Sequence, residues 1–174
     1  APHMPVHLGS MDSTVKSIIK NNPTLSPGDI FAINAPYNGG THLPDITIVN
    51  PIWNSKKSEI IFYTAARGHH TDIGGLTPGS MPCNSTDIHE EGIYIDNWKI
   101  VDNGVFKEDE IKNKLLSGSH PARSPLTNIA DLKAQIAACK KGEAELLKVV
   151  DKYGLETVFR FQELVCQNAE NAVR

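Results

Sequence analysis

The protein has 174 residues, of which 40% are hydrophobic and 21% charged, an ordinary composition for one soluble globular domain with a sizeable core. Its formal net charge of -3 and its lack of a basic run argue against a general nucleic-acid binder. No apolar stretch approaches the roughly 20 residues that a membrane helix needs, so we expect no membrane partner. The three cysteines form no Cys-x-x-Cys pair, which favours a reducing compartment and a cytoplasmic location.

The first half of the chain alternates apolar runs with loops. Apolar residues at helical spacing predict a helix over residues 12–21. Short apolar runs predict strands over residues 29–34, 46–53 and 59–67. Functional side chains often lie on loops at strand ends, because the sheet holds them rigidly. The loops that follow the first and third of these strands are therefore the first places to look for a site.

The second half of the chain changes from strands to helices. A strand is predicted over residues 92–102, with a hairpin-like turn at 102–104, and a short helix over 107–116. From Thr127 onward, apolar residues recur with a helical period to the end of the sequence. The Tyr153-Gly154 pair predicts a stop between two helices, because glycine commonly ends a helix.

These elements predict an α+β fold: a mixed sheet with loops that carry the site, followed by a C-terminal antiparallel helix pair. We expect a single domain over residues 1–174, with mainly strands and loops in residues 1–126 and the helical pair in residues 127–174. The chain starts without an initiator Met and stops inside a helical pattern. We therefore expect an internal fragment of a larger region.

Two loops place imidazole and carboxylate side chains close together in the sequence. His42 and Asp45 lie three residues apart in the first loop, and His69, His70 and Asp72 lie within four positions in the second. Zinc, manganese and iron prefer such a mixture of nitrogen and oxygen ligands. From spacing alone, a metal site and ordinary hydrogen-bonding loop residues are about equally good interpretations.

Metal-ligand chemistry suggests a division of roles among these five residues. The first choice of metal ligands is His42, Asp45 and His69, which leaves a position open for water. Adjacent residues usually point apart, so His70 is expected to be a supporting partner or a proton shuttle rather than an equal ligand. Asp72 could hold one imidazole in its tautomer. The alternative for each residue is a hydrogen-bonding role in its loop.

The same loops contain a basic residue and two glycine pairs. Arg67 could bind a carboxylate or phosphate, although a structural ion pair is an equally good interpretation. Gly39-Gly40 and Gly74-Gly75 could form a substrate or phosphate loop from consecutive N–H groups, with tight turns as the alternative. The sequence has neither a Walker A motif nor Gly-x-Gly-x-x-Gly. We therefore do not expect the chain to bind ATP by a familiar loop.

Several segments, taken together and in order, resemble the hydantoinase B/oxoprolinase family over nearly the whole chain. They are residues 2–11, 34–45, 67–75, 77–82 with 84–86, and 128–138. Members of this family are much longer, so the resemblance implies that the chain is a fragment from within the B-type region.

The resemblance implies an ATP-dependent amidohydrolase of cyclic amides. Many hydantoinase B sequences have Asp where this chain has Ala35, and the Ala form is more similar to the 5-oxoprolinases. The implied reaction converts 5-oxo-L-proline to L-glutamate through a phosphorylated intermediate, which a hydantoinase A-like domain or subunit makes with the ATP that it binds. The B part would hold a divalent metal (manganese, zinc, iron or magnesium), and the resemblance supports His42, Asp45 and His69 as its ligands.

In this interpretation His70, Asp72 and Arg67 are the candidate catalytic residues. The chain alone is expected to be inactive because it lacks the phosphorylating half, and the parent protein is expected to be an oligomer. Alternatives within the family are an N-methylhydantoin hydrolase and a subunit of the acetone or acetophenone carboxylase type. An alternative of another class is a non-catalytic scaffold for the ATP-binding partner.

Overall fold

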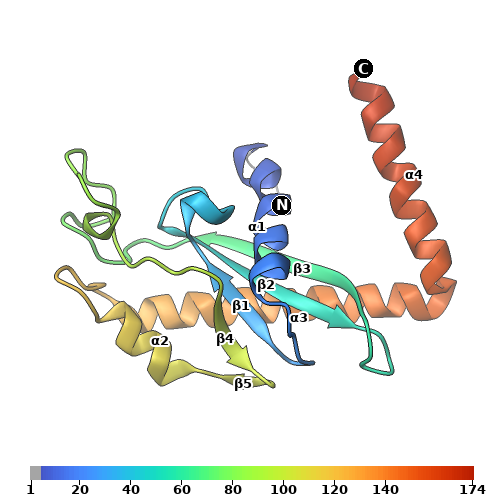
Figure 1. Cartoon of the computed structure of the whole chain (residues 1–174), viewed down its shortest axis with the longest axis horizontal. Coiled ribbons are helices and arrows are strands. Elements are labelled where there is room, and N and C mark those ends of the chain that lie inside the picture. Colours follow the sequence, from blue (N-terminus) through green and yellow to red (C-terminus); the bar gives the residue numbers. More distant parts are fainter. Residues whose placement is uncertain (1–4) are drawn as a thin grey trace. The chain divides into compact units, whose positions relative to one another are not determined.

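The computed structural model describes residues 5–174 (Figure 1). Residues 2–4, at the start of the first segment that resembles the family, lie outside the described residues. The chain divides into two compact units, the first extending to Cys139 and the second comprising Lys140–Arg174. Helix α3 (Pro125–Tyr153) passes through the boundary between them.

The first unit is built on a five-stranded sheet within the described residues. The strand order is β3-β2-β1-β4-β5. The bounds are β1 (Ile30–Ile33), β2 (Asp45–Trp53), β3 (Ile60–His69), β4 (Trp98–Asp102) and β5 (Val105–Phe106). All four pairings are antiparallel, so the prediction of a mixed sheet was wrong. The reason is local, because β2–β3 and β4–β5 are hairpins, and a hairpin can only join antiparallel strands.

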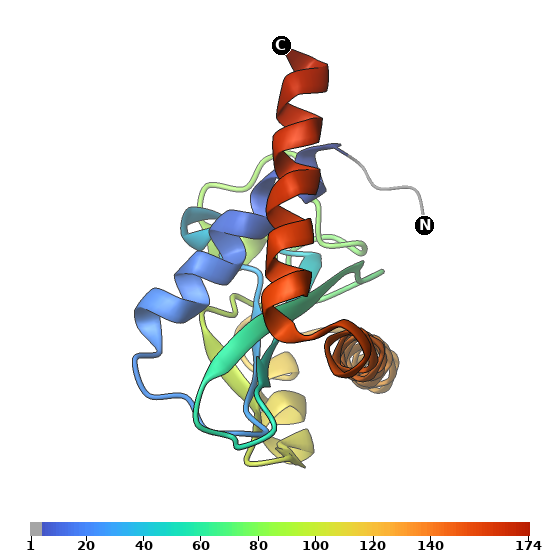
Figure 2. The same ribbon diagram turned by 90° about the vertical axis from the view of Figure 1, so that its right-hand side faces the viewer.

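Helices cover both faces of this sheet (Figure 2). Strand β1 shows why: Ile30 and Ala32 belong to one apolar cluster, and Phe31 and Ile33 to the other, as expected when side chains alternate along a strand. Helix α1 (Pro5–Asn21) contributes Ile18 to the second cluster. Helix α2 (Glu108–Leu115) and the first half of α3 pack on the first cluster. The predicted α+β class is confirmed.

The ends of several elements differ from the predictions. Helix α1 begins at Pro5 rather than near residue 12, and the strand predicted over residues 92–102 is limited to β4. Two short 3-10 helices, η1 (Pro36–Asn38) and η2 (Ile88–Glu90), lie in loops for which the sequence predicts no helix. The early start of α1 bears directly on the site described below.

The second unit contains the end of α3 and helix α4 (Leu155–Val173), joined by Gly154. Gly154 has a φ of 83° and lets the chain change direction within one residue. In Figure 1, α4 turns away from the end of α3 instead of running back beside it. The prediction of an antiparallel pair was wrong, because such hairpins need a loop of about two to five residues.

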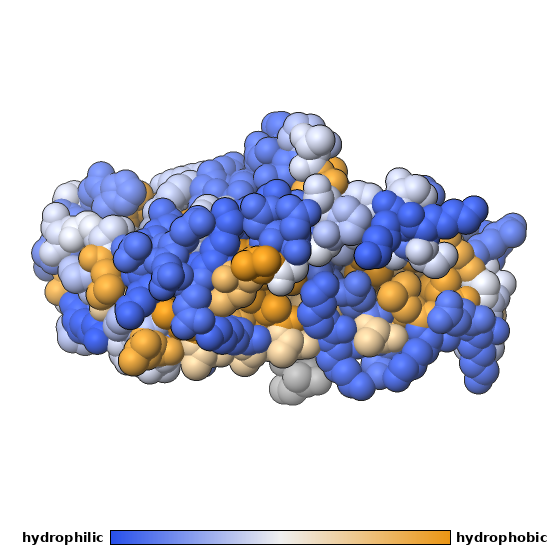
Figure 3. Space-filling model, turned by 90° about the horizontal axis from the view of Figure 1, so that it is seen from below, coloured by the Kyte–Doolittle hydropathy of each residue, from blue (hydrophilic) through white to orange (hydrophobic). Residues whose placement is uncertain are grey.

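Apolar side chains reach the surface in this second unit. They line a groove of about 780 Å³ that includes Leu146, Val149, Tyr153, Phe161 and Val165. Figure 3 shows one face of the molecule, on which apolar patches lie between hydrophilic side chains.

Among the helices that the structure describes, none combines the length and the apolar character that crossing a membrane would require.

Candidate metal centre

The hairpin of β2 and β3 brings the two loops of the sequence together. Its register pairs Asp45 with His69 and Thr47 with Arg67, directly across the two strands. Directly opposed residues have Cβ atoms about 4.5–5.5 Å apart and point to the same face. Alternation along β2 identifies this face as the one that α1 covers, because Val49 belongs to the α1-side cluster. The start of β2 and the end of β3 therefore meet at one corner of the sheet.

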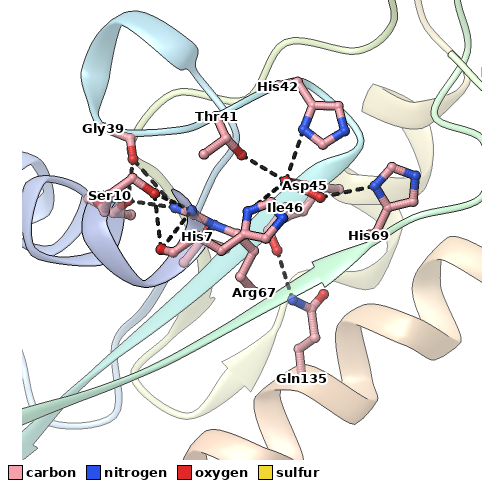
Figure 4. Close-up of polar contacts among 12 residues, drawn as sticks. His7, Ser10, Gly39, Thr41, His42, Asp45, Ile46, Arg67, His69 and Gln135 are labelled. Carbon is pink, nitrogen blue, oxygen red and sulfur yellow. Dashed lines mark hydrogen bonds and ion pairs between the residues drawn. The ribbon is translucent and has the colours of Figure 1, made fainter. Parts of the chain in front are cut away.

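His42 completes a group of three predicted ligands at this corner (Figure 4). The backbone N–H of Asp45 donates to the carbonyl of His42 at 3.0 Å, which closes the turn before β2. His42 Nδ1 lies 2.9 Å from Asp45 Oδ2, and His69 Nδ1 lies 3.0 Å from Asp45 Oδ1. One ligand atom from each residue lies within 4.8 Å of the other two. The structure thus brings together all three residues that were predicted as ligands.

The burial of the three side chains at this corner would suit an open metal site. The side chain of Asp45 is 2% exposed, whereas those of His42 and His69 are 34% and 55% exposed. Thr41 Oγ1 donates to Asp45 Oδ2 at 2.7 Å. A buried carboxylate needs donors or cations around it, and two imidazole nitrogens on its open side suit a divalent ion. Water or substrate could fill the remaining positions around such an ion.

His7 is a fourth group at Asp45, and the sequence analysis missed it. It lies near the start of α1, and its Nδ1 is 3.2 Å from Asp45 Oδ2. It was missed because the helix was predicted only from residue 12. A signal was present, since His7, Ser10 and Thr14 follow at spacings of three and four, which places polar side chains on one helical face.

Arg67 connects α1 to the cluster. The five N–H groups of its guanidinium donate to oxygen atoms of α1, of β2 and of the intervening loop: Thr47 Oγ1, the His7 carbonyl, Ser10 Oγ, Thr14 Oγ1 and the Gly39 carbonyl. Burial lowers the pKa of Arg67, and the carboxylate of Asp45 opposes this shift. Since all five donors have protein partners, the contact of Arg67 with a substrate carboxylate or phosphate stays a prediction.

His70 lies on the opposite side of the strand from His69, as the alternation of adjacent residues predicted. It is 1% exposed, and its Nε2 and Nδ1 each lie 3.1 Å from an α3 side chain, Gln135 Oε1 and Asn128 Nδ2 respectively. The Gln135 amide nitrogen donates to the carbonyls of Ile46 and Ala66. These partners assign the proton of His70 to Nε2, and a role in proton transfer stays a prediction.

The buried position of His70 predicts a dependence of stability on pH. Burial lowers its pKa in the folded protein below the ordinary value of 6.5. The unfolded chain therefore takes up a proton first as the pH falls through 6.5, and the free energy of unfolding decreases. We expect a His70→Gln variant, whose amide can still donate to Gln135, to show a weaker decrease between pH 7.5 and 5.5. Urea unfolding of both proteins measures this, and equal pH dependences would contradict it.

Asp72 organises the loop after β3. Its carboxylate accepts hydrogen bonds from the backbone N–H groups of Gly74, Gly79 and Arg123, each at 3.1 Å, and forms an ion pair with the Arg123 side chain at 2.6 Å. Burial alone would raise the pKa of Asp72, but these donors outweigh it and lower the pKa. The carboxylate thus contacts a guanidinium where an imidazole had been predicted, and its catalytic role stays a prediction.

The glycine pairs lie where the backbone passes close to other backbone segments. The N–H groups of Gly40, Gly74 and Gly75 donate to Ala35 O, Asp72 Oδ1 and His120 O. Gly39, Gly74 and Gly75 all have φ near +94°, and a Cβ on any of the four glycines would collide with backbone atoms of another segment. Three of the four N–H groups that could bind an anion therefore already have acceptors, and the substrate or phosphate loop stays a prediction.

The chain is similar to several known proteins. The family model of hydantoinase B/oxoprolinase matches residues 1–174. The chain is 44% identical to 5-oxoprolinase 1 of Arabidopsis thaliana, in an alignment that covers all of this chain and 14% of that protein. Among solved structures, it is similar to an ATP-dependent caprolactamase from Pseudomonas jessenii, with a TM-score of 0.79, 32% identity, and coverage of 90% of this chain and 26% of that one.

A second solved structure, of an acetone carboxylase without nucleotide, also has a TM-score of 0.79, with 25% identity and coverage of 90% of this chain and 20% of that one. The chain thus spans about one seventh of the length of the 5-oxoprolinase that it matches. The match of the family model over all residues settles the classification: the chain belongs to the hydantoinase B/oxoprolinase family.

Proposed function

We propose that this chain is the metal-bearing B-type part of an ATP-dependent hydrolase of cyclic amides, and that its substrate is 5-oxo-L-proline. The similarity to 5-oxoprolinase 1 over the whole chain supports the substrate. The similarity to an ATP-dependent caprolactamase supports the reaction class, since caprolactam and 5-oxoproline are both cyclic amides. The reaction opens the ring at its amide C–N bond and gives L-glutamate.

The observation that carries the proposal is the cluster of His42, Asp45 and His69. Their ligand atoms lie within 4.8 Å of one another, and the cross-strand register fixes two of the three residues on the rigid end of a hairpin. A divalent ion held there would act as a Lewis acid on an amide or acyl-phosphate oxygen. The exposed imidazoles leave room beside the cluster for a small substrate.

The donor atoms narrow the choice of metal. Two imidazole nitrogens with one carboxylate oxygen suit zinc, manganese or iron. Magnesium strongly prefers oxygen ligands and retains several waters, so it is the weakest of the four candidates. We therefore assign the site to a first-row transition metal, with zinc included.

ATP would act outside this chain. The sequence has no Walker A loop, and it spans 14% of the length of the related 5-oxoprolinase, so most of such an enzyme lies elsewhere. A hydantoinase A-like domain or subunit would phosphorylate the amide oxygen of the substrate. In the metal-bearing part, one water would then add to the activated carbon and the ring C–N bond would break, with the nitrogen taking a proton, to give an acyl phosphate. A second water would release phosphate from it and give L-glutamate.

Metal content tests the proposal most directly. Purified without a metal-affinity column, the chain is expected to contain near-stoichiometric metal by mass spectrometry, and a His42→Ala/His69→Ala variant is expected to lose it. A His89→Ala/His120→Ala variant removes the same number of imidazoles outside the cluster and should retain the metal. Circular dichroism checks that all three proteins are folded. A metal-free wild-type chain, even after incubation with zinc, manganese and iron, would sink the proposed site.

The substrate is tested with the partner restored. In the full-length protein, with its hydantoinase A-like partner and ATP, we expect release of glutamate from 5-oxo-L-proline, and no release by this 174-residue chain alone. Opening of N-methylhydantoin instead, or ATP-dependent carboxylation of acetone, would assign the chain to the corresponding alternative. Absence of all three reactions, together with absence of metal, would favour a non-catalytic scaffold.

A further inference from the structure

We propose that His7, on helix α1, is a positioning residue of the metal centre, which donates from Nδ1 to Asp45 and fixes the carboxylate for the metal. This inference rests on the proposed metal site and extends it to a helix that was not part of the predicted ligand set. The contact is direct, because Nδ1 of His7 lies 3.2 Å from Oδ2 of Asp45.

The surroundings of His7 Nδ1 indicate that it orients the carboxylate rather than binding the metal. The compact group of potential ligand atoms contains His42, Asp45 and His69, and His7 is not part of it. In Figure 4, His7 and His69 approach the carboxylate from different sides. The Nδ1 atom is buried and makes no hydrogen bond within residues 5–174 of this structure. The Asp45 oxygen, 3.2 Å away, is the acceptor to which it would donate.

Metal binding makes this donor more important. A metal ligand must be unprotonated, so Nδ1 of His42 and Nδ1 of His69 cannot donate to Asp45 while they bind an ion. Among the described residues, the hydroxyl of Thr41, 2.7 Å from Oδ2, then remains as a donor to the carboxylate, and Nδ1 of His7, 3.2 Å from Oδ2, would be the second. Hydrogen bonds to a ligating carboxylate fix its orientation, and losing such a partner typically weakens metal binding by about 10–100-fold.

Helix α1 is held firmly enough for His7 to serve this purpose. Arg67 donates to the carbonyl of His7 itself and to the side chains of Ser10 and Thr14, one and two helical turns farther along. Thr14 is fully buried and also donates to the carbonyl of Gly39, in the loop that leads to His42. The backbone of His7 is therefore tied to the same corner of the sheet as the ligands.

Two substitutions at His7 separate donation from other roles. His7→Ala removes the imidazole, whereas His7→Asn retains an N–H donor at the same number of bonds from the backbone as Nδ1. His120→Ala is the control, because His120 is exposed and its contact with Gly75 uses the backbone carbonyl. Cobalt(II) is titrated into each metal-free protein, and its dissociation constant and visible absorption spectrum are recorded.

We expect His7→Ala to weaken cobalt binding by about 10–100-fold, His7→Asn to restore most of the affinity, and His120→Ala to match the wild type. The saturated spectra should have the same shape in all four proteins, because the ligands are unchanged. Wild-type affinity in His7→Ala would overturn the proposal, as would a changed spectrum that Asn does not restore, which would make His7 a ligand. If the wild-type chain itself binds no metal, the proposed site fails and this inference with it.

Discussion

Replacing Arg67 with alanine is expected to lower the free energy of unfolding by about 2–4 kcal/mol, measured by urea denaturation at pH 7 with a chelator present. The guanidinium donates to five oxygen atoms at the junction of α1, β2 and the loop between η1 and β2. Removing it takes the guanidinium donors away from the hydroxyls of Thr47, Ser10 and Thr14. It also removes a positive charge that interacts with the buried carboxylate of Asp45. Arg67 is partly exposed, so the expected loss lies below that of a fully buried pair.

Lysine at this position distinguishes charge from geometry. An Arg67→Lys variant retains the positive charge but has one nitrogen, which cannot reach Thr47, Ser10 and Thr14 together as the planar guanidinium does. We expect it to recover less than half of the lost stability. Full recovery would show that charge alone matters, and that Arg67 does not hold α1 in place through its hydrogen bonds.

The pairing of Asp45 with His69 was within reach of sequence reasoning. Strands were predicted over residues 46–53 and 59–67, and the short polar segment between them is typical of a hairpin. Once a hairpin is assumed, antiparallel register brings the start of one strand opposite the end of the other. The same reasoning correctly placed His69 and His70 on opposite sides, because side chains alternate along a strand.

Contacts distant in sequence were beyond such reasoning. His70 lies between Asn128 and Gln135, and these α3 residues follow it by 58 and 65 positions without a local signal to connect them. Periodicity predicted α3 itself but not which strand its polar residues contact. The contact of Asp72 with an imidazole was predicted wrongly for the same reason, since its partner Arg123 is 51 residues away.

The start of α1 was missed for a different physical reason. Its first turns have Gly9 in the interior and a face of His7, Ser10 and Thr14, which does not show the apolar period of an amphipathic helix. This polar face packs against Arg67 and Asp45, which contact its side chains. Residue propensities and periodicity therefore predict a helix that begins too late in the sequence. The tertiary contacts of the site stabilise its first turns.

Gly39 provides a second test of how α1 is held, and we expect Gly39→Ala to destabilise the protein by about 3 kcal/mol or more. Two costs add. Gly39 has a φ of +93°, which costs alanine about 1 kcal/mol. Its new Cβ would also lie 2.6 Å from the backbone carbon of Ser13 and the backbone nitrogen of Thr14, neither of which can move without shifting α1.

A matched substitution isolates the second cost. Gly118 also has a positive φ, +83°, but a Cβ built there meets no atom within 4 Å. Gly118→Ala should therefore show the conformational cost alone, and its difference from Gly39→Ala measures the contact with α1. Since that contact lies next to the Thr14 and Arg67 hydrogen bonds, cobalt binding should also weaken in Gly39→Ala and remain unchanged in Gly118→Ala. Equal stabilities for the two variants would mean that α1 can move away from the loop at little cost, and His7 could then not be held in a fixed position beside Asp45.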